Sequence, residues 1–524
     1  MLTNRITVCS VHLLVLAVLW LLCETMVLAT EEDKKGSRAP EESRTEQEPL
    51  KTSKTAHRIT IDGRQLTYSA IAGEILVQLK EESAKGRIFY VAYELEGNKN
   101  LERPLTFAFN GGPGAASVWL HLGGVGPKRI VLSEGGRALS PPVRYKDNPY
   151  SWLSFTDLVF IDPVGTGFSR SEAHDEKKDK AFYGVEQDIE AIAEFIRLYL
   201  SKNGRWRSPK FLVGESYGTT RASGLAWRLH ERYGIDLNAM VLISPVLDFQ
   251  TILFHPTSDL PYALFLPTYC ATAWRHGLLS KRLQAKKLSE LLDDVEAFCL
   301  NDYSVLLAKG DTLDPREEAR LSKQLHEYTS LPPALFKERH FRMDWRLFTK
   351  SLLKKKGLLI GRMNSSIIGL SLDPTDPDPQ YDPSLDTLYG PFSSAVNAYV
   401  REDLKLQSER FYEFLNPDVS KKWDWSSGLT LDQGFVDLSY TLKKLITIRK
   451  SMKVFVARGI YDLATPYFAS TYTLQQMWLG DAGSNIVVKD YNAGHMIYTD
   501  KDALISLFQD VRNFFGETLK SSAH

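Results

Sequence analysis

The sequence predicts an α/β protein whose mostly parallel sheet is covered by helices on both faces. Short apolar runs that favour strands lie at 105–109, 158–161, 210–213 and 239–243. The segment 185–200 repeats apolar residues with the spacing of one helix face. Apolar strands that alternate with helices are typical of a parallel sheet buried on both sides.

A long insertion interrupts this alternation. The stretch 251–434 is rich in Lys and Glu and mainly helix-like, whereas a strand-like run returns at 453–457 and a helical pattern at 501–515. We therefore expect one α/β core in two parts, 59–250 and 435–519, with a large, mainly helical cap inserted between them.

The composition describes an ordinary enzyme-sized globular protein. Of the 524 residues 43% are hydrophobic, and 64 Lys and Arg balance 64 Asp and Glu. Zero net charge disfavours a nucleic-acid partner and a polybasic membrane-binding surface, because both depend on excess positive charge. The sequence leaves the oligomeric state open, with a homodimer as one possibility.

The N-terminal segment predicts export. Arg5 precedes an apolar stretch at 11–22, and small residues near Ala29 suit cleavage by signal peptidase. The apolar stretch has about a dozen residues, fewer than the roughly 20 that span a bilayer. We expect a signal peptide at 1–29 and a secreted or periplasmic protein, with an uncleaved N-terminal anchor as the alternative. The mixed-charge segment 30–58 is expected to be a disordered leader.

Two of the four cysteines, Cys9 and Cys23, lie in the predicted signal peptide. The mature chain keeps Cys270 and Cys299, an even number for an oxidising compartment. The hypothesis is that they form one disulfide. Two buried free thiols are the alternative, because buried free cysteine is common.

The segment 214–218 reads Gly-Glu-Ser-Tyr-Gly between a predicted strand and a predicted helix. In such a pattern the glycines permit a tight, strained turn that lifts the serine hydroxyl clear of the sheet at the start of a helix. The pentapeptide alone is a weak signal, since glycine and serine are common in turns. Its place between a strand and a helix favours Ser216 as a catalytic nucleophile.

A serine nucleophile needs a histidine base and an acid that orients the histidine. In α/β-hydrolases the chain order is serine, acid, histidine. Among the downstream histidines, His495 lies in a loop just past a late strand. For the acid we favour Asp462, which follows the strand at 453–457, over Asp248, which we expect to cap a turn.

The reaction also requires donors for the oxyanion, which are worth several kcal/mol of transition-state stabilisation. The segment 110–114 reads Asn-Gly-Gly-Pro-Gly after an early strand, where such enzymes place one donor. The amide of Tyr217, the residue after the nucleophile, would be the other donor. A simple Gly-Pro turn is the alternative interpretation of 110–114.

The sequence contains no recognised cofactor or metal motif. It lacks a phosphate-binding Gly-Lys-Ser/Thr loop, a complete dinucleotide fingerprint and a His-Glu-x-x-His pair. The aspartates between 373 and 382 alternate with prolines, which favours a solvated loop over a calcium site. We expect neither a cofactor nor a metal.

Taken together, four motifs resemble the serine carboxypeptidases of the α/β-hydrolase superfamily. They lie in the expected order at 109–114, 162–169, 214–218 and 494–496. The segment 361–383 is similar to the bacterial branch of that family. The resemblance implies hydrolysis of C-terminal residues from peptides or proteins through an acyl-enzyme, with Ser216, Asp462 and His495 as the triad.

The resemblance also implies roles for the residues around the triad. The amides of Gly112 and Tyr217 form the oxyanion hole, and Asn110, Gly111 and Glu215 bind substrate, with Asn110 and Glu215 at its terminal carboxylate. A carboxyl group binds a carboxylate only by sharing a proton, because like charges in a small site raise one pKa. We therefore expect peptide hydrolysis to be favoured at acidic pH, mainly through KM.

The chain departs from the family pattern at two positions. A further glutamate that many members carry is Gly124 here, and the cysteine usual after Gly-Gly-Pro-Gly is Ala115. The first change keeps open an acyltransferase or esterase with the same triad. A catalytically silent binding protein on this fold is a third alternative, disfavoured because every triad position is filled.

Overall fold

The computed structural model describes residues 49–79, 84–97, 103–172, 180–426 and 434–521. Contacts divide the chain after Glu48, and the description below concerns the unit that begins at Pro49. The expected signal peptide lies outside the described residues. Within the described residues, no helix has the length and apolar character required to cross a membrane.

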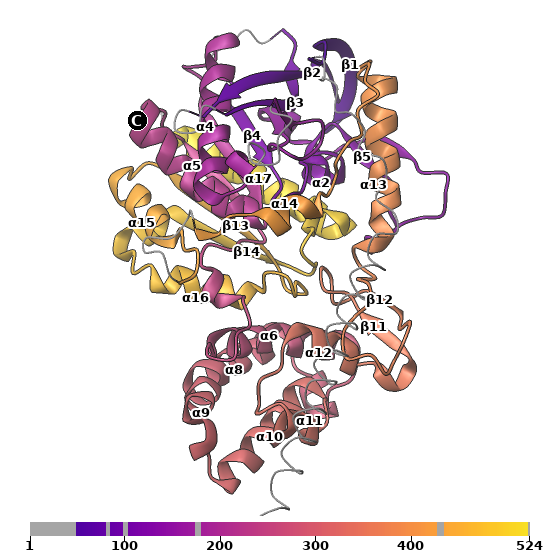
Figure 1. Cartoon of the computed structure of the whole chain (residues 1–524), viewed down its shortest axis with the longest axis vertical. Helices are drawn as coiled ribbons and strands as arrows, with labels where there is room; N and C mark the ends of the chain where they lie inside the picture. The colour runs from indigo at the N-terminus through magenta and orange to yellow at the C-terminus, as the bar shows by residue number, and fades with distance from the viewer. Residues whose placement is uncertain (1–48, 80–83, 98–102, 173–179, 427–433, 522–524) are drawn as a thin grey trace, which may run out of the picture. The chain divides into compact units, whose positions relative to one another are not determined.

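A ten-stranded sheet forms the centre of this unit (Figure 1). Its main path is β1 Ser53–Ile61, β2 Arg64–Gln78, β3 Lys85–Leu95, β7 Asp157–Ile161, β4 Leu105–Phe109, β9 Lys210–Glu215, β10 Ala239–Ile243, β13 Lys453–Gly459 and β14 Ile486–Tyr491, and β8 Arg170–Ser171 pairs with β3. The strands from β7 to β14 along this path are parallel, and β1, β2 and β3 pair antiparallel. The predicted α/β class with a mostly parallel sheet is confirmed.

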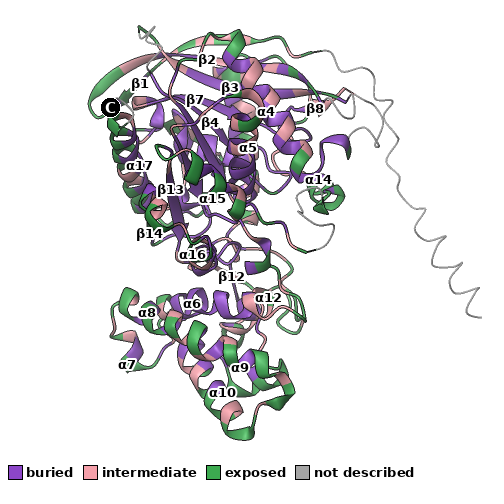
Figure 2. Ribbon diagram, turned by 90° about the vertical axis from the view of Figure 1, so that its left-hand side faces the viewer, coloured by how far each residue is buried: buried purple, intermediate pink, exposed green. Residues whose placement is uncertain are grey.

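Helices cover both faces of the sheet. Successive residues of a strand point to opposite sides, so each strand contributes side chains to an apolar cluster on either face. In β9, Phe211 and Val213 belong to one apolar cluster and Leu212 to the other. The first cluster includes α17 (Lys501–Ser521), and the second includes α4 (Val185–Lys202), α5 (Tyr217–Tyr233) and α15 (Ser439–Ile448). The central strands are accordingly buried along their length (Figure 2).

The insertion forms a third hydrophobic cluster of its own. The helices of the insertion that contribute to this cluster are α6 Leu260–Arg275, α7 Lys281–Gln284, α8 Leu288–Phe298, α9 Ser304–Lys309, α10 Pro315–Thr329, α11 Pro333–Glu338 and α12 Trp345–Ser351. The hairpin of β11 Leu358–Ile360 and β12 Ile368–Leu370 follows them in the chain. The cluster continues onto α16 (Tyr467–Gln476) through Phe468. The cap is thus anchored on the segment that follows Asp462.

The structure corrects two expected boundaries. Strand β1 begins at Ser53, inside the expected leader 30–58, because Ser53–Ile61 pair with β2 and alternate residues are more buried, although most of them are polar. Helix α13 (Asp386–Ala398) packs with the cluster of the sheet through Phe392, although it lies inside the expected cap 251–434. The separate helical body therefore ends well before residue 434.

The expected disulfide is wrong for this structure. Cys270 in α6 and Cys299 after α8 are both free and fully buried within the cap cluster. Burial raises the pKa of both thiols, so they are protonated and unreactive at neutral pH. The alternative of two buried free thiols is confirmed, and the cap is held by packing.

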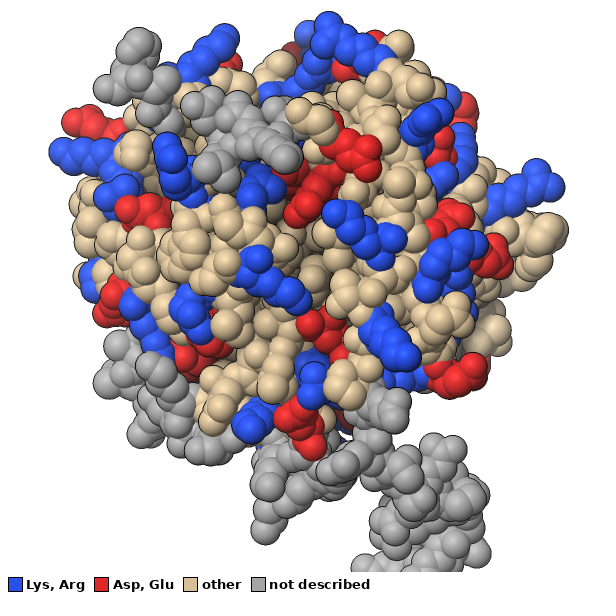
Figure 3. Space-filling view, turned by 90° about the horizontal axis from the view of Figure 1, so that it is seen from above, with Lys and Arg blue, Asp and Glu red and all other residues tan. Residues whose placement is uncertain are grey.

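Charged side chains are interspersed on the face seen in Figure 3. Lysine and arginine lie among aspartate and glutamate there, with uncharged surface between them. On that face, as in the sequence as a whole, positive and negative side chains are both present.

Candidate active site

Ser216 lies at the turn between β9 and α5, with a left-handed φ of 59° that is strained for a serine. The two glycines of the motif make this turn possible. A Cβ at Gly214 would lie 2.1 Å from the carbonyl oxygen of Gly218, and a Cβ at Gly218 would lie 2.9 Å from that of Phe109. The predicted nucleophile elbow is therefore present.

His495 and Asp462 form a buried pair, with Nδ1 of the histidine 2.7 Å from Oδ2 of the aspartate. The other aspartate oxygen accepts hydrogen bonds from the amides of Ala464 (2.7 Å) and Thr465 (3.0 Å). The Thr465 hydroxyl donates to Oδ2 at 2.8 Å. These donors fix the carboxylate in an orientation that faces the imidazole.

The imidazole is fixed through its backbone as well. The amide of His495 donates to the carbonyl of Met363 at 2.6 Å, and the Ser244 hydroxyl donates to the carbonyl of His495 at 2.7 Å. Burial lowers the pKa of His495, but the charge and hydrogen bond of Asp462 outweigh it, so that this pKa lies above its ordinary value. The ring is positioned and electrostatically prepared to receive a proton.

Within the described residues, no hydrogen bond joins the Ser216 hydroxyl to His495. Catalytic hydrogen bonds are often long before substrate binds and tighten in the Michaelis complex. Both side chains follow the carboxyl ends of parallel strands, Ser216 after β9 and His495 after β14. They therefore meet at the same edge of the sheet.

The glycine loop after β4 lies directly against the elbow. A Cβ at Gly111 would lie 2.5 Å from the amide nitrogens of both Tyr217 and Gly218, so only glycine permits this approach. Gly112 has a φ of 102°, which a side chain would strain. The loop thus packs Gly111, the residue before Gly112, against the amide of Tyr217.

Asn110 and Glu215 are joined by a hydrogen bond of 3.0 Å from the asparagine Nδ2 to Oε1. The asparagine Oδ1 accepts from the amide of Leu120 at 2.9 Å. Both side chains are buried, at 2% and 3% exposure. Of the pair, Oε2 of Glu215 is left without a hydrogen-bond partner in the described structure.

Tyr498 faces this pair from the segment after His495. Burial raises the pKa of Glu215 to about 7, while His495 and then the Tyr498 hydroxyl act in the lowering direction. The hydroxyl is itself fully buried and, among the described residues, has no hydrogen bond of normal geometry. Glu215 and Tyr498 therefore interact with each other next to Ser216.

Packing of the Tyr498 side chain also explains the departure at Gly124. A Cβ at Gly124 would lie 2.5 Å from the Cβ of Tyr498 and 2.9 Å from Cδ1 of Leu504. The adjacent Gly123 is equally crowded, because a Cβ there would lie 2.3 Å from Cε2 of the Tyr498 ring. The Cβ of Tyr498 and the side chain of Leu504 occupy the room that a side chain at position 124 would need.

Asp248 does not compete for the role of triad acid. It caps the short helix Phe249–Thr251, where its carboxylate accepts from the amide of Gln250 at 2.9 Å. The expectation that this residue caps a turn is confirmed.

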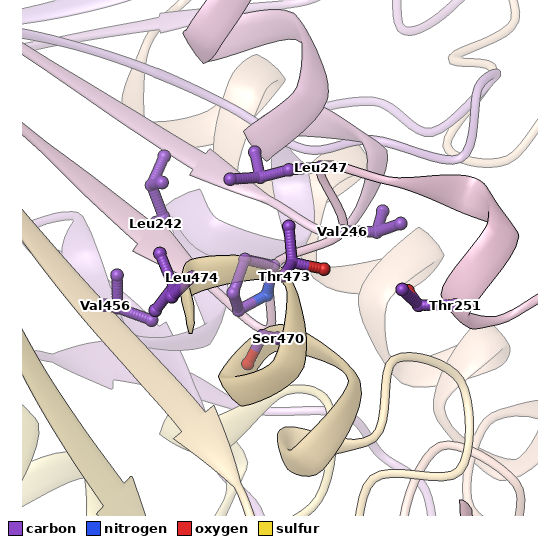
Figure 4. A pocket seen from close by; sticks show the side chains of 9 residues that line it. Leu242, Val246, Leu247, Thr251, Val456, Ser470, Thr473 and Leu474 are labelled. Atoms are coloured by element: carbon purple, nitrogen blue, oxygen red, sulfur yellow. The ribbon is translucent and has the colours of Figure 1, made fainter. Parts of the chain in front are cut away.

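A small cavity lies between β10, β13 and α16 (Figure 4). Leu242, Val456 and Leu474 contribute apolar side chains to it. Its volume of about 10 Å³ is at the lower limit for one water molecule. It is a packing gap and not a ligand site.

Sequence reasoning missed three residues next to the triad. They are Thr465, which supports Asp462; Tyr498, which faces Glu215; and Arg362, whose charge acts on His495. A threonine three residues after the acid is a weak local signal, whereas the other two come close only through the fold. No group of metal-binding side chains occurs in the described part of the chain.

Comparison with known proteins agrees with this geometry. The family model described as serine carboxypeptidase matches residues 76–524. A pheromone-processing carboxypeptidase KEX1 from Yarrowia lipolytica is 28% identical over 476 residues, which cover 84% of this chain and 67% of the relative. Serine carboxypeptidase-like 13 from Arabidopsis thaliana is 29% identical over 45% of this chain and 48% of its own length. These relatives are fungal and plant proteins, and the bacterial branch stays a prediction.

A solved structure confirms the fold. The prohormone-processing carboxypeptidase KEX1 from Saccharomyces cerevisiae superposes with a TM-score of 0.52 and 18% identity, over 85% of this chain and 91% of that one. The likeness and the strand order identify the α/β-hydrolase fold that was expected. Since the family model covers most of the sequence, the chain belongs to the serine carboxypeptidase family and is a serine-type carboxypeptidase.

Proposed function

We propose that Ser216, His495 and Asp462 carry out the hydrolysis. The hydroxyl oxygen of Ser216 attacks the carbonyl carbon of the last peptide bond while its proton passes to Nε2 of His495. Asp462 keeps the imidazole in the tautomer and orientation that this transfer needs. The observation that carries this proposal is the 2.7 Å contact of Nδ1 with a carboxylate already fixed by two amides.

The negative charge on the carbonyl oxygen is stabilised by the amides of Gly112 and Tyr217. The carbon–nitrogen bond then breaks, and His495 returns its proton to the departing amine, which leaves an acyl-enzyme. A water molecule, deprotonated by the same histidine, cleaves the ester in the second half of the cycle. The close packing of Gly111 on the elbow supports this placement of the donors.

In the proposed reaction, Asn110, Gly111 and Glu215 bind the substrate. The terminal carboxylate accepts a hydrogen bond from Asn110 and shares the proton of Glu215, whose pKa is raised to about 7 by burial. The hydrogen bond from Asn110 to Glu215 supports this role, because it brings both side chains together next to Ser216. Peptide or protein C-termini are the partners that this arrangement suits.

We also propose that the protein is exported, on the basis of the apolar segment 11–22 and the small residues before Ala29. The oligomeric state stays a prediction. No cofactor or metal enters the proposed mechanism, since the triad and two backbone amides supply all of its proton transfers and charge stabilisation.

Digestion of a defined peptide mixture, read by mass spectrometry, tests the proposal. We expect loss of single residues from free C-termini, no cleavage of C-terminal amides, and no product from Ser216→Ala. Hydrolysis of esters without trimming of peptides would favour the esterase alternative, which the crowded Gly124 keeps open. Cleavage in the middle of peptides would contradict exopeptidase action.

A further inference from the structure

A second cleft, of about 250 Å³, lies between α12, the β11–β12 hairpin and the loop before α13. Trp345 and Thr349 line it from α12, Arg362 and Met363 follow β11, and Tyr381, Asp382, Leu385 and Asp386 contribute from the other side. The cleft combines an aromatic wall with a guanidinium group, a combination suited to a planar anion.

Arg362 is unusual among the charged residues of this structure. Its Nε is buried and has no hydrogen-bond partner, and its guanidinium lies 4.5 Å from the centre of the Trp345 ring. The exposed Arg346 lies 4.6 Å from the same ring. In the described ranges neither arginine takes part in an ion pair. A buried guanidinium N–H without an acceptor is costly, and a carboxylate from outside would satisfy it.

The nearby carboxylates do not neutralise this charge directly. Both oxygens of Asp382 accept hydrogen bonds from backbone amides, among them those of Arg362 (3.2 Å) and Met363 (3.0 Å). One oxygen of Asp386 accepts from the amide of Asp382 at 3.0 Å. Lys350 adds positive charge, because its described acceptors are neutral oxygens of Ser371, Asp373 and Gln380. The two aspartates accept donors of the loop, and the three donors of Lys350 have acceptors, whereas Nε of Arg362 has none.

The cleft is tied to the triad through the backbone. The carbonyl of Met363 accepts from the amide of His495 at 2.6 Å, and that of Arg362 accepts from the amide of Leu463 at 3.0 Å. The charge of Arg362 acts on both His495 and Asp462. Because the histidine returns a proton to the departing amine, its side of the active site is the side of the leaving group. In a carboxypeptidase the leaving group is the C-terminal residue.

We propose that Arg362, stacked on Trp345, binds a carboxylate of the residue that is released. An acidic side chain is the carboxylate we assign to it, so that peptides ending in Glu or Asp are preferred over those ending in Gln or Asn. The inference rests on the proposed function, since it assumes that the triad releases a C-terminal residue.

The test compares N-blocked dipeptides that end in Glu and in Gln, two nearly isosteric residues. For the unmodified protein we expect kcat/KM to be about 10 to 100 times higher with Glu, as for one hydrogen-bonded charge pair of about 1.5–3 kcal/mol. Arg362→Gln removes this preference by lowering kcat/KM for Glu alone, and Arg362→Lys restores part of it. Arg316→Gln, an exposed arginine on α10, is the matched control and leaves both substrates unchanged.

The other outcomes are equally decisive. An equal loss on both peptides in Arg362→Gln overturns the inference, because Arg362 then does not distinguish an acidic side chain from a neutral one. Equal rates for Glu and Gln in the unmodified protein, unaffected by Arg362→Gln, overturn the inference and leave the proposed function intact. If no peptide is cleaved, the proposed function fails. Calorimetric binding of the two dipeptides to Ser216→Ala then still decides whether Arg362 recognises an acidic residue.

Discussion

Glu215→Gln is the substitution whose effect the structure predicts best. The carboxyl group is buried, and burial raises its pKa from 4.5 to about 7. Below pH 4.5 the group is protonated in both the folded and the unfolded chain and has no pH-dependent effect. Between pH 4.5 and 7 the unfolded chain releases the proton and the folded chain keeps it, so stability falls as the pH rises.

This difference in pKa corresponds to about 3 kcal/mol at about 1.4 kcal/mol per pH unit. Glutamine has nearly the same shape and no proton to lose. Its carbonyl oxygen can accept from Asn110, and its amide can donate to the unpartnered hydroxyl of Tyr498. We therefore expect Glu215→Gln to match the unmodified protein near pH 4.5 and to be about 3 kcal/mol more stable above pH 7.

The assay is urea unfolding followed by tryptophan fluorescence at intervals from pH 4.5 to 8. Glu290→Gln is the matched control, because this glutamate is exposed on α8. An exposed substitution is expected to stay within about 0.5 kcal/mol at every pH. Parallel stability curves for Glu215→Gln and the unmodified protein would refute the reasoning, since they would mean that the folded protein accommodates the charged carboxylate without cost.

Three further results are expected. Asp462→Asn should lower kcat about 10³- to 10⁴-fold with little change in KM, because the imidazole loses the acceptor that fixes its tautomer. An unchanged kcat for hydrolysis of a blocked dipeptide would exclude Asp462 as the triad acid. Gly124→Ala should destabilise the fold by about 1–3 kcal/mol in thermal unfolding, because the new methyl group meets Tyr498, and Gly135→Ala at an open position should not. KM for a blocked dipeptide should rise as the pH passes about 7, where Glu215 loses its proton, and should stay flat in Glu215→Gln.

The sequence alone predicts the framework well. Runs such as 105–109 and 239–243 are apolar throughout, and they form the buried parallel strands β4 and β10. Ser216, Asp462 and His495 each carry a local signal, the end of a strand followed by a loop, and the structure joins the acid to the histidine. The strands are predictable because they are apolar throughout, and the three proposed triad residues follow strands whose carboxyl ends lie at one edge of the sheet.

The remaining features depend on contacts that local patterns do not encode. The role of Tyr498 as a neighbour of the site becomes apparent only in the structure, where its side chain packs on Gly123 and Gly124. Arg362 lies more than one hundred residues before His495, and backbone bonds through Met363 bring it close. The start of strand β1 is hard to recognise because its charged residues make it resemble the polar leader, while pairing along β2 from Ser53 to Ile61 stabilises it.

The pairing of Gly124 with Tyr498 has a consequence for the pH dependence of binding. Two neighbouring carboxyl groups share protons and titrate in two coupled steps. A phenol beside Glu215 behaves differently, since burial raises the pKa of Tyr498 well above 10 and keeps its hydroxyl a neutral donor throughout the working range. Of these two groups, only Glu215 then changes charge near pH 7. The rise of KM with pH should therefore follow one ionisation, tenfold per pH unit at its steepest, and a steeper rise would require a second titrating group in the carboxylate site.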